Sequence, residues 1–299
     1  MLDYSALAAI GAVIREGSFE QAAQALGITP SAVSQRVRGL EERLGAILIV
    51  RGQPCMPTDL GARLGAHLDR VRLLEADLAP VLASDGADRP PTLRIAVNAD
   101  SLATWFAPAA ADFGRATGLR LDLALDDEAH TADRLRSGDV LAAVTADPRP
   151  VQGCRTIALG ALRYAACASP DFMQRHFGQQ VNGDALARAP HMRFDRRDRL
   201  QARWAAEAHG FDLAAPAHWV PATHGFLDLG LAGLAWALHP VGLAAPHLAA
   251  GRLIELPPRL RIDVRLYWTV ARLHATSLRH LTRAVGAAAA DSLVRPSDD

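Results

Sequence analysis

Residues 18–45, SFEQAAQALGITPSAVSQRVRGLEERLG, constrain the fold of this chain most, because they contain two helix starts and two helix ends. Ser18 followed by Gln21 is typical of a capping box, so we expect a helix to begin near Phe19. Gly27 is typical of the position after the end of a helix. Thr29, followed by a proline, is typical of the cap of a second helix. Two helices joined by a turn of three or four residues predict a helix-turn-helix.

The second helix has two chemically different faces. Val33, Val37, Leu40 and Leu44 recur at helical spacing, so we expect them to pack against the rest of the domain. The opposite face carries hydroxyl, amide and guanidinium groups, which can reach base edges and phosphates from the major groove of double-stranded DNA. The segment AILIVRGQPCMPT then predicts a hairpin, or wing, with an arginine that contacts phosphate. The predicted DNA-binding residues are Ser31, Ala32, Ser34, Gln35, Arg36, Arg38 and Arg51. A helix-turn-helix also occurs in proteins that bind no DNA, and this alternative stays open.

The charge of the chain supplies no general attraction to DNA. Acidic and basic residues balance at 32 each, and every basic residue is an arginine. DNA binding must therefore depend on how the charges are distributed over the surface.

Cysteine usage and hydropathy predict a cytoplasmic protein without metal or other cofactor. The three cysteines, Cys55, Cys154 and Cys167, have no metal-type spacing, and no secretory signal is visible. We interpret them as buried thiols, with a redox pair of Cys154 and Cys167 as the alternative. The uncharged stretch from Leu229 to Gly251 is broken by glycines and prolines, so we expect a buried strand and loops there, with a membrane span as the weaker alternative.

Residues 58–83 predict one long helix, which Thr58 can cap. Its leucines follow one another at steps of three or four, and the narrow stripe is typical of a dimerisation helix. Packing on its own domain is the alternative. The stretch SDGADRPP then predicts a hinge. We therefore divide the chain into a DNA-binding domain (1–58), a linker or dimerisation helix with its hinge (59–91) and a third part (92–299).

The third part predicts an α/β domain. LRIAV, LRLDLAL and VLAAVT are strand-like, and helix-like segments lie around residues 108–116 and 131–136. Alternation of strands and helices is typical of a largely parallel sheet, and the remaining length suffices for two lobes.

At this point a family resemblance becomes specific. FEQAAQALGITPSAVSQRVRGLEERLGAILIVR resembles the winged helix-turn-helix of the LysR-type transcriptional regulators. VNADSLATWF, the DDE at residues 126–128 and LYW at residues 266–268 resemble the ArgP/LysG (IciA) branch of that family. The resemblance covers essentially the whole chain. It implies a long linker helix and a two-lobed effector domain like that of periplasmic binding proteins, with lobe I at about 92–161 and 268–299 and lobe II at about 162–267.

The resemblance also implies partners and a function. Members of this branch activate the gene of a basic-amino-acid exporter in response to lysine or arginine. The implied partners are double-stranded DNA, a lysine or arginine effector, RNA polymerase, and further copies of the chain in a homodimer or homotetramer. Catalytic motifs such as G-x-S-x-G, H-E-x-x-H or a P-loop are absent, so we predict no enzyme activity.

Residue types add to the expected effector site. A helical turn capped by Asp100 or Ser101 would offer amide groups to a carboxylate, and three acids after a strand end could receive an ammonium or guanidinium group. A plain cap and a solvated turn are the alternatives. The expected effector-binding residues are Asn98, Asp100, Ser101, Trp105, Asp127, Glu128, Thr145, Asp195, Thr223 and His224. His224 stands where the branch has an acidic residue, which leaves the choice of effector open.

Three other interpretations remain as alternatives. The first is an architectural or replication-inhibiting DNA-binding protein without an effector, and the second is a LysR-type regulator with a different effector. The third is a solute-binding protein without a DNA function, which the helix-turn-helix disfavours.

Overall fold

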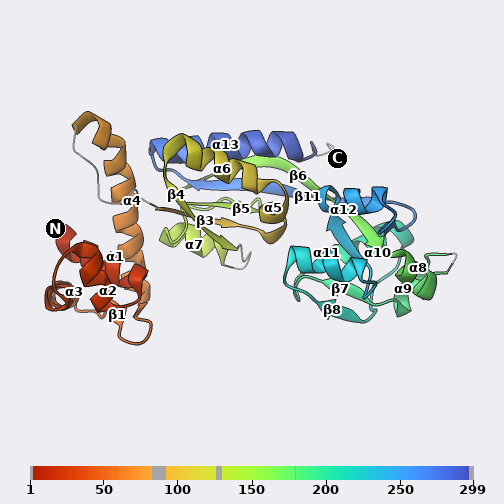
Figure 1. Ribbon diagram of the computed structural model, residues 1–299, viewed down its shortest axis with the longest axis horizontal. Coiled ribbons are helices and arrows are strands. Elements are labelled where there is room, and N and C mark those ends of the chain that lie inside the picture. Colours follow the sequence, from red (N-terminus) through yellow and green to blue (C-terminus); the bar gives the residue numbers. More distant parts are fainter. Residues whose placement is uncertain (1–2, 83–91, 126–129, 179, 296–299) are drawn as a thin grey trace.

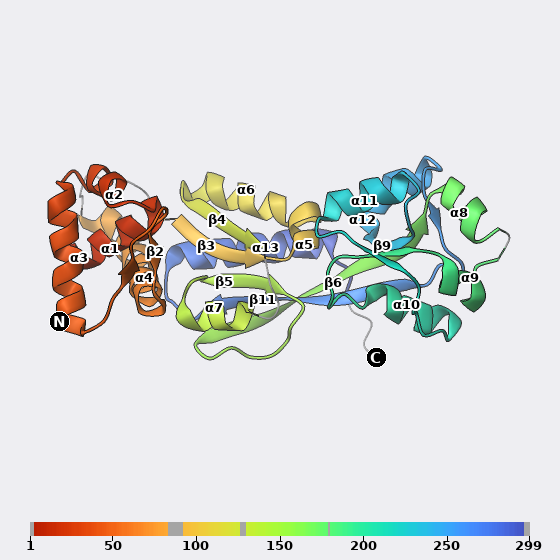
Figure 2. The ribbon, with the colours of Figure 1, turned by 90° about the horizontal axis from the view of Figure 1, so that it is seen from below.

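The computed structural model describes residues 3–82, 92–125, 130–178 and 180–295. The molecule is elongated, with a helical N-terminal domain at one end and two α/β lobes in line beyond it (Figures 1 and 2). Within these ranges no helix combines the length and the apolar character that crossing a bilayer requires.

The N-terminal domain is the predicted winged helix-turn-helix. Helices α1 (Tyr4–Glu16), α2 (Phe19–Leu26) and α3 (Pro30–Leu44) are followed by the antiparallel hairpin of β1 (Ile49–Val50) and β2 (Met56–Pro57). The predicted caps are confirmed, because Ser18 and Thr29 accept hydrogen bonds from backbone amides of α2 and α3. The Ser18 hydroxyl in addition donates a hydrogen bond to Glu20 Oε2 at 2.7 Å.

The two faces of α3 are largely as predicted. Val33, Val37 and Leu40 are buried in the core of the N-terminal domain. Leu44 is 42 % exposed, so its predicted burial was wrong. It occupies the last turn of α3, where the helix has already passed the helices that cover the other three side chains.

The long helix predicted for residues 58–83 is α4 (Asp59–Leu82), and Thr58 caps it by accepting a hydrogen bond from Gly61 N at 3.2 Å. Along α4, Leu68 belongs to the core of the N-terminal domain, whereas Leu73 packs in the hydrophobic core of the α/β part, together with side chains of its sheet.

The α/β part contains one mixed sheet with the order β10-β6-β11-β5-β3-β4, in which β10 is Ile254–Glu255, and β9 (Ala237–Pro240) also pairs with β6. Strand β3 (Thr92–Val97) is parallel to β4 (Arg120–Leu125) and to β5 (Ala142–Thr145). The other pairs of this sheet are antiparallel. The expectation of a largely parallel sheet was therefore wrong, because β6 (Cys154–Ala168) and β11 (Arg261–Ala271) run in opposite directions through both lobes.

Lobe I is the half of the sheet next to the N-terminal domain. Helices α6 (Phe106–Thr117) and α13 (Thr276–Ser292) cover one face, and α7 (Thr131–Ser137) covers the other (Figures 1 and 2). Ile95 and Val97 point into the first layer, while Ala96 between them packs with the α7 layer. The short α5 (Ala99–Thr104) follows β3 at the edge that meets lobe II.

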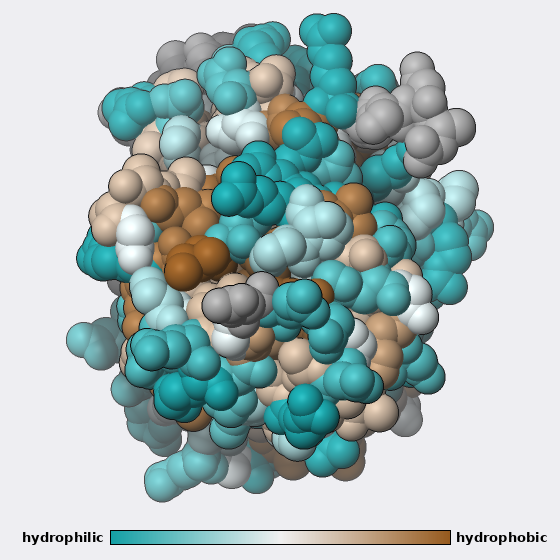
Figure 3. Space-filling model, turned by 90° about the vertical axis from the view of Figure 1, so that its right-hand side faces the viewer, coloured by the Kyte–Doolittle hydropathy of each residue, from teal (hydrophilic) through white to brown (hydrophobic). Residues whose placement is uncertain are grey.

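Lobe II lies at the far end. The elements of this lobe are α8 (Pro170–His176), α9 (Gly183–Arg188), β7 (His191–Arg193), α10 (Leu200–His209), β8 (Ala217–Trp219), α11 (Thr223–Leu231), β9 (Ala237–Pro240), α12 (Val241–Ala249) and β10 (Ile254–Glu255). Its outer end is mostly hydrophilic, with hydrophobic residues exposed in several areas between the hydrophilic ones (Figure 3). The prediction of loops after β9 was wrong, because this segment forms helix α12. The helix tolerates Pro246 because Ala244 and Leu248 pack against the core beside β6.

The two lobes are joined where β6 and β11 cross between them. The pairing of the two strands shifts register between Leu266 and Tyr267, next to Gly160, whose φ is +132°. At the same place Val294 forms a bridge with Ala161 through two backbone hydrogen bonds of 2.9 and 3.0 Å. The segment after α13 is thus attached to the crossing strands.

Candidate DNA-binding face and effector site

The outward face of α3 presents the predicted polar groups. Ser31, Gln35 and Arg38 are exposed, while the buried valines of the same helix face the core. The remaining predicted residues of this helix, Ala32, Ser34 and Arg36, are half-buried. The face is therefore available to a ligand that approaches along the helix, as DNA does in this motif.

Arg51 connects the wing to this helix. Its Nη2 donates a hydrogen bond to Ser34 Oγ at 3.0 Å, and its guanidinium lies 4.8 Å from the ring centroid of Phe19. The stacking and the hydrogen bond restrict the arginine side chain. The structure thus brings the predicted wing residue and the predicted recognition helix into one surface.

Asp100 lies where the two lobes meet. Its Oδ1 accepts a hydrogen bond from Thr223 Oγ1, and its Oδ2 accepts one from the hydroxyl of Tyr164, both at 2.6 Å. Asp100 is on α5 of lobe I, Thr223 is the first residue of α11 in lobe II, and Tyr164 is on the crossing strand β6. One carboxylate therefore joins three elements from two lobes.

Asn98 caps α5, because its Oδ1 accepts a hydrogen bond from Ser101 N at 3.2 Å. The prediction that Asp100 or Ser101 caps this turn was wrong. Strand β3 ends at Val97, so Asn98 is the residue that still has extended backbone angles and can act as the cap. Ser101 is buried, and its Oγ accepts a hydrogen bond from Trp105 Nε1 at 3.0 Å.

The other predicted residues of lobe I are not joined to Asp100 by contacts between the described residues. Trp105 is 2 % exposed and belongs to the core. Thr145 ends β5, is also buried, and accepts a hydrogen bond from Asp147 N at 3.1 Å. Asp127 and Glu128 lie outside the described residues.

In lobe II the predicted residues have different environments. Asp195 holds a turn by accepting hydrogen bonds from the backbone amides of Arg197 and Asp198, at 2.7 and 2.9 Å. His224 is exposed on α11, directly after Thr223. Among the described residues, Asp195 and His224 make no polar contact with each other, and their roles stay predictions.

Sequence reasoning missed Tyr164 and Asp198. Burial raises the pKa of Asp198, and the negative charge of Asp100 adds to this rise. Asp198 also accepts hydrogen bonds from the amides of Phe194 and Leu200, both at 2.9 Å, which oppose the rise. The sequence gives no signal for Tyr164, since it stands in an apolar strand. Asp198 could have been noticed as the second acid of FDRRDRL.

Cation–π contacts surround one half-exposed tryptophan of lobe II. The guanidinium carbons of Arg193 and Arg196 lie 4.9 and 5.3 Å from the Trp219 ring centroid. Arg193 also donates hydrogen bonds to the backbone carbonyls of Asp198 and Arg196. This arrangement fixes the loop that carries Asp195 and Asp198.

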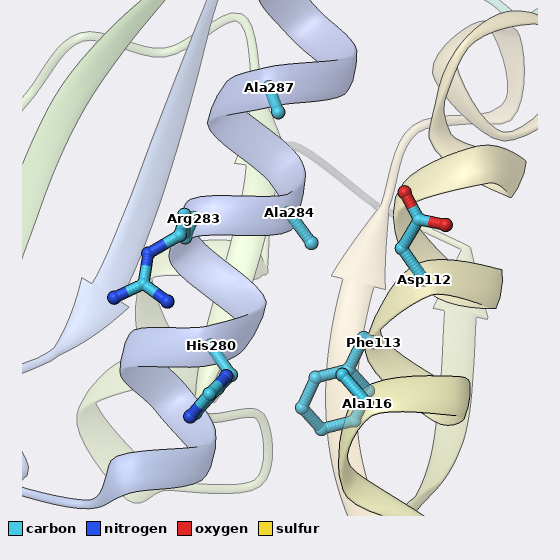
Figure 4. A pocket seen from close by; sticks show the side chains of 7 residues that line it. All are labelled: Asp112, Phe113, Ala116, His280, Arg283, Ala284 and Ala287. Atoms are coloured by element: carbon cyan, nitrogen blue, oxygen red, sulfur yellow. The ribbon is translucent and has the colours of Figure 1, made fainter.

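A groove of about 260 Å³ lies elsewhere, between α6 and α13 (Figure 4). Phe113 points from α6 toward α13, and Ala284 points back toward it. The lining residues are Asp112, Phe113, Ala116, His280, Arg283, Ala284 and Ala287. The groove is mostly apolar and lies away from α5 and α11, so it does not belong to the junction that Asp100 forms.

The cysteines form no redox pair among the described residues. Cys154 and Cys167 stand at opposite ends of β6. They are thirteen positions apart along the strand, which corresponds to about 40 Å, so they are too far apart for a disulfide. Burial raises the pKa of both thiols, to about 12 for Cys167. The interpretation as buried thiols is confirmed. In the part of the chain that the structure describes, no group of three His, Cys, Asp or Glu side chains could hold a metal ion.

Comparison with known proteins identifies the family. Residues 4–62 match the family "Bacterial regulatory helix-turn-helix protein, lysR family", and residues 86–290 match the "LysR substrate binding domain". The chain belongs to the LysR family of transcriptional regulators. It is 46 % identical over 300 residues to the transcriptional regulator ArgP of Pseudomonas aeruginosa, with 99 % of each chain covered.

Two solved structures place this LysR-family regulator in the ArgP/LysG branch. ArgP from Mycobacterium tuberculosis is 38 % identical, with a TM-score of 0.81 and coverage of 99 % of this chain and 100 % of that one. LysG from Corynebacterium glutamicum, solved with bound effector Arg, is 39 % identical, with a TM-score of 0.69 and the same coverage. The predicted family, branch and two-lobed fold are confirmed.

Proposed function

We propose that this regulator binds arginine or lysine between its two lobes and that binding changes its interaction with DNA. The observation that carries the proposal is the similarity, over 99 % of the chain, to a LysG that was solved with bound effector Arg. An anionic carboxylate at the junction of the lobes, that of Asp100, supports a cationic effector. Charge-assisted hydrogen bonds of this kind are strong.

We propose that the effector contacts are made by the residues around this junction. Asp100 and Thr223 carry the strongest support, because the structure already joins them across the lobes. The support is weaker for Asp195 and His224 in lobe II and for Asn98, the cap of α5, in lobe I. The whole proposed set is Asn98, Asp100, Ser101, Trp105, Asp127, Glu128, Thr145, Asp195, Thr223 and His224.

We propose that α3 reads DNA in the major groove and that the wing contacts phosphate. Exposure of Gln35 and Arg38, and the fixed position of Arg51, support these roles. The whole proposed set is Ser31, Ala32, Ser34, Gln35, Arg36, Arg38 and Arg51. The half-buried members of α3 would contact the backbone of the duplex at close range.

The proposal extends to the domain bounds, the oligomeric state, the location in the cell and the regulated gene. We propose domains at 1–58, 59–91 and 92–299, a homodimer or homotetramer, and a cytoplasmic location. The regulated gene would be that of an amino-acid exporter, with contact to RNA polymerase during activation and no catalytic step by the regulator itself. Leu60 and Leu74 of α4 are exposed and support self-association through that helix, whereas Leu64 and Leu68 pack on the chain's own N-terminal domain, as the alternative predicted.

Titration calorimetry on the full-length protein tests the effector. Arginine, lysine and citrulline would be compared, because citrulline has nearly the shape of arginine without its charge. We expect heat of binding with arginine or lysine and at least about tenfold weaker binding of citrulline, which corresponds to about 1.4 kcal/mol. No heat with either basic amino acid would contradict the proposal and favour a regulator with another effector or with none.

A further inference from the structure

The long helix α4 connects the two halves of the molecule rigidly. Leu68 packs in the core of the N-terminal domain, and Leu73, further along the same helix, is 2 % exposed in the core shared with lobe I. An α-helix keeps its direction over such a short distance. A contact that holds the second half of α4 on lobe I therefore also orients the DNA-binding domain.

The first such contact is made by Arg70. Its Nη2 donates a hydrogen bond at 3.0 Å to the backbone carbonyl of Ser137, the last residue of α7. A cation at the C-terminal end of a helix interacts favourably with the helix dipole. Gly138 follows with φ +78°, and a Cβ at this position would overlap the guanidinium of Arg70. The glycine thus serves both the turn and the close approach of Arg70.

The second contact is made by Asp77. Its Oδ2 accepts a hydrogen bond at 2.7 Å from the backbone amide of Thr276, the first residue of α13. The position that would normally cap α13 is Ala275, which has no side-chain acceptor. Asp77 therefore supplies, from another part of the chain, the cap that the local sequence of α13 lacks.

The two contacts lie on one face of α4. Arg70 and Asp77 are seven residues apart, which is close to two full turns, and Leu73 lies between them. The helix thus places a cation against the C-terminal end of α7 and an anion against the N-terminal end of α13. Each charge has the sign that the adjacent helix end attracts.

We propose that Arg70 and Asp77 clamp α4 onto lobe I and so fix the position of the DNA-binding domain relative to the effector-binding part. The clamp consists of two hydrogen bonds and one buried leucine, so it is small enough to open. The inference concerns the geometry of the regulator and does not depend on which effector it binds.

Hydrogen exchange tests the contact itself in the full-length protein. In Asp77→Ala we expect the amide of Thr276 to exchange at least tenfold faster, because it loses its acceptor. Asp77→Asn should restore most of the protection, since asparagine is an equally good cap. Glu75→Ala, at an exposed position of the same helix, is the matched control and should leave the exchange unchanged. Equal exchange in the Asp77→Ala variant and the wild type would overturn the clamp.

A DNA-binding experiment tests the positioning role. A duplex would be selected from a random pool by the wild-type protein and used either whole or cut between its two half-sites. We expect Arg70→Ala/Asp77→Ala to bind the whole duplex at least fivefold more weakly while binding to a single half-site stays within twofold, because only two-site binding needs a fixed spacing. An equal change on both duplexes, or no change on either, would overturn the positioning role.

These outcomes are distinguishable from a failure of the proposed function. The exchange and DNA measurements contain no amino acid, so they can support the clamp even if calorimetry detects no binding of arginine or lysine.

Discussion

At the scale of single residues, Asp100 has the most demanding position, because its carboxylate accepts hydrogen bonds from Thr223 in the other lobe and from Tyr164 on a crossing strand. We expect Asp100→Asn to weaken arginine binding at least about tenfold in calorimetry, because the neutral amide keeps the shape and loses the charge. Thr223→Val is the matched variant: it removes one hydrogen bond to Asp100 and keeps the anion, so its effect should be smaller. Wild-type affinity in Asp100→Asn would contradict an effector role for this carboxylate.

Arg51 and Gln35 make separable contributions to DNA binding. Arg51→Ala should weaken binding to all sequences and reduce the slope of log affinity against log salt by about one unit, because one phosphate contact is lost. Gln35→Ala should instead reduce discrimination between operator and mismatched duplexes. Gel shifts at several salt concentrations measure both effects. An unchanged slope for Arg51→Ala would exclude that contact, and unchanged discrimination for Gln35→Ala would exclude base reading.

The buried histidine His239 makes the stability of lobe II depend on pH. Burial lowers its pKa to about 4, and the nearby His247 contributes to this shift. The unfolded chain binds a proton near pH 6.5, so stability is complete above that pH and is lost as the pH falls toward 4. The loss amounts to at most about 3 kcal/mol from this group. Urea unfolding at pH 7 and pH 5 measures the part of this loss that falls between the two pH values, about 2 kcal/mol.

The matched substitutions are His239→Gln, which should flatten this dependence, and His274→Gln at an exposed position, which should not. His191 in the same lobe has a pKa lowered to about 4 by burial and by Arg193, so it contributes in the same direction. Stability that is equal at pH 7 and pH 5 in the wild type would contradict neutral buried histidines.

At the scale of helices and strands, the sequence predicted what local chemistry determines. The caps Ser18 and Thr29, and the long α4, depend on neighbours a few residues away, so their patterns are readable. The antiparallel crossing of β6 and β11 was not predictable, because it pairs residues about a hundred positions apart. The same limit applies to the site: Tyr164 meets Asp100 only through this long-range topology.

The crossing of the lobes depends on a glycine that no other residue can replace without strain. Gly160 has φ +132°, and a Cβ there would lie 3.0 Å from Leu293 Cβ and from Val294 O. We expect Gly160→Ala to lower the free energy of unfolding by about 1–3 kcal/mol. Gly114→Ala in α6 is the control, since its Cβ would meet nothing within 4 Å and should stabilise the helix by about 0.5–1 kcal/mol. Equal effects would contradict a strained crossing.

At the scale of the whole molecule, the candidate DNA-binding face and the candidate effector site are separated in space. The polar face of α3 and the junction at Asp100 lie at different places along an elongated chain, with α4 and lobe I between them (Figure 2). The contacts of Arg70 and Asp77 are the described polar links between α4 and lobe I. Among the described residues, these links and the packing of Leu73 can carry an influence of the effector from lobe I to the DNA-binding domain.

This arrangement predicts how effector and DNA influence each other. If arginine changes the DNA affinity by a given factor, DNA must change the arginine affinity by the same factor, and coupling of this kind is typically about 5- to 150-fold. We expect the factor to fall toward one in Arg70→Ala/Asp77→Ala, while the affinity for arginine in the absence of DNA stays as in the wild type, because Asp100 is untouched. Gel shifts with and without arginine, and calorimetry with and without DNA, measure the factor from both sides. A double variant that keeps the full factor would contradict coupling through the contacts of Arg70 and Asp77, and would leave the packing of Leu73 and the association of subunits as the routes.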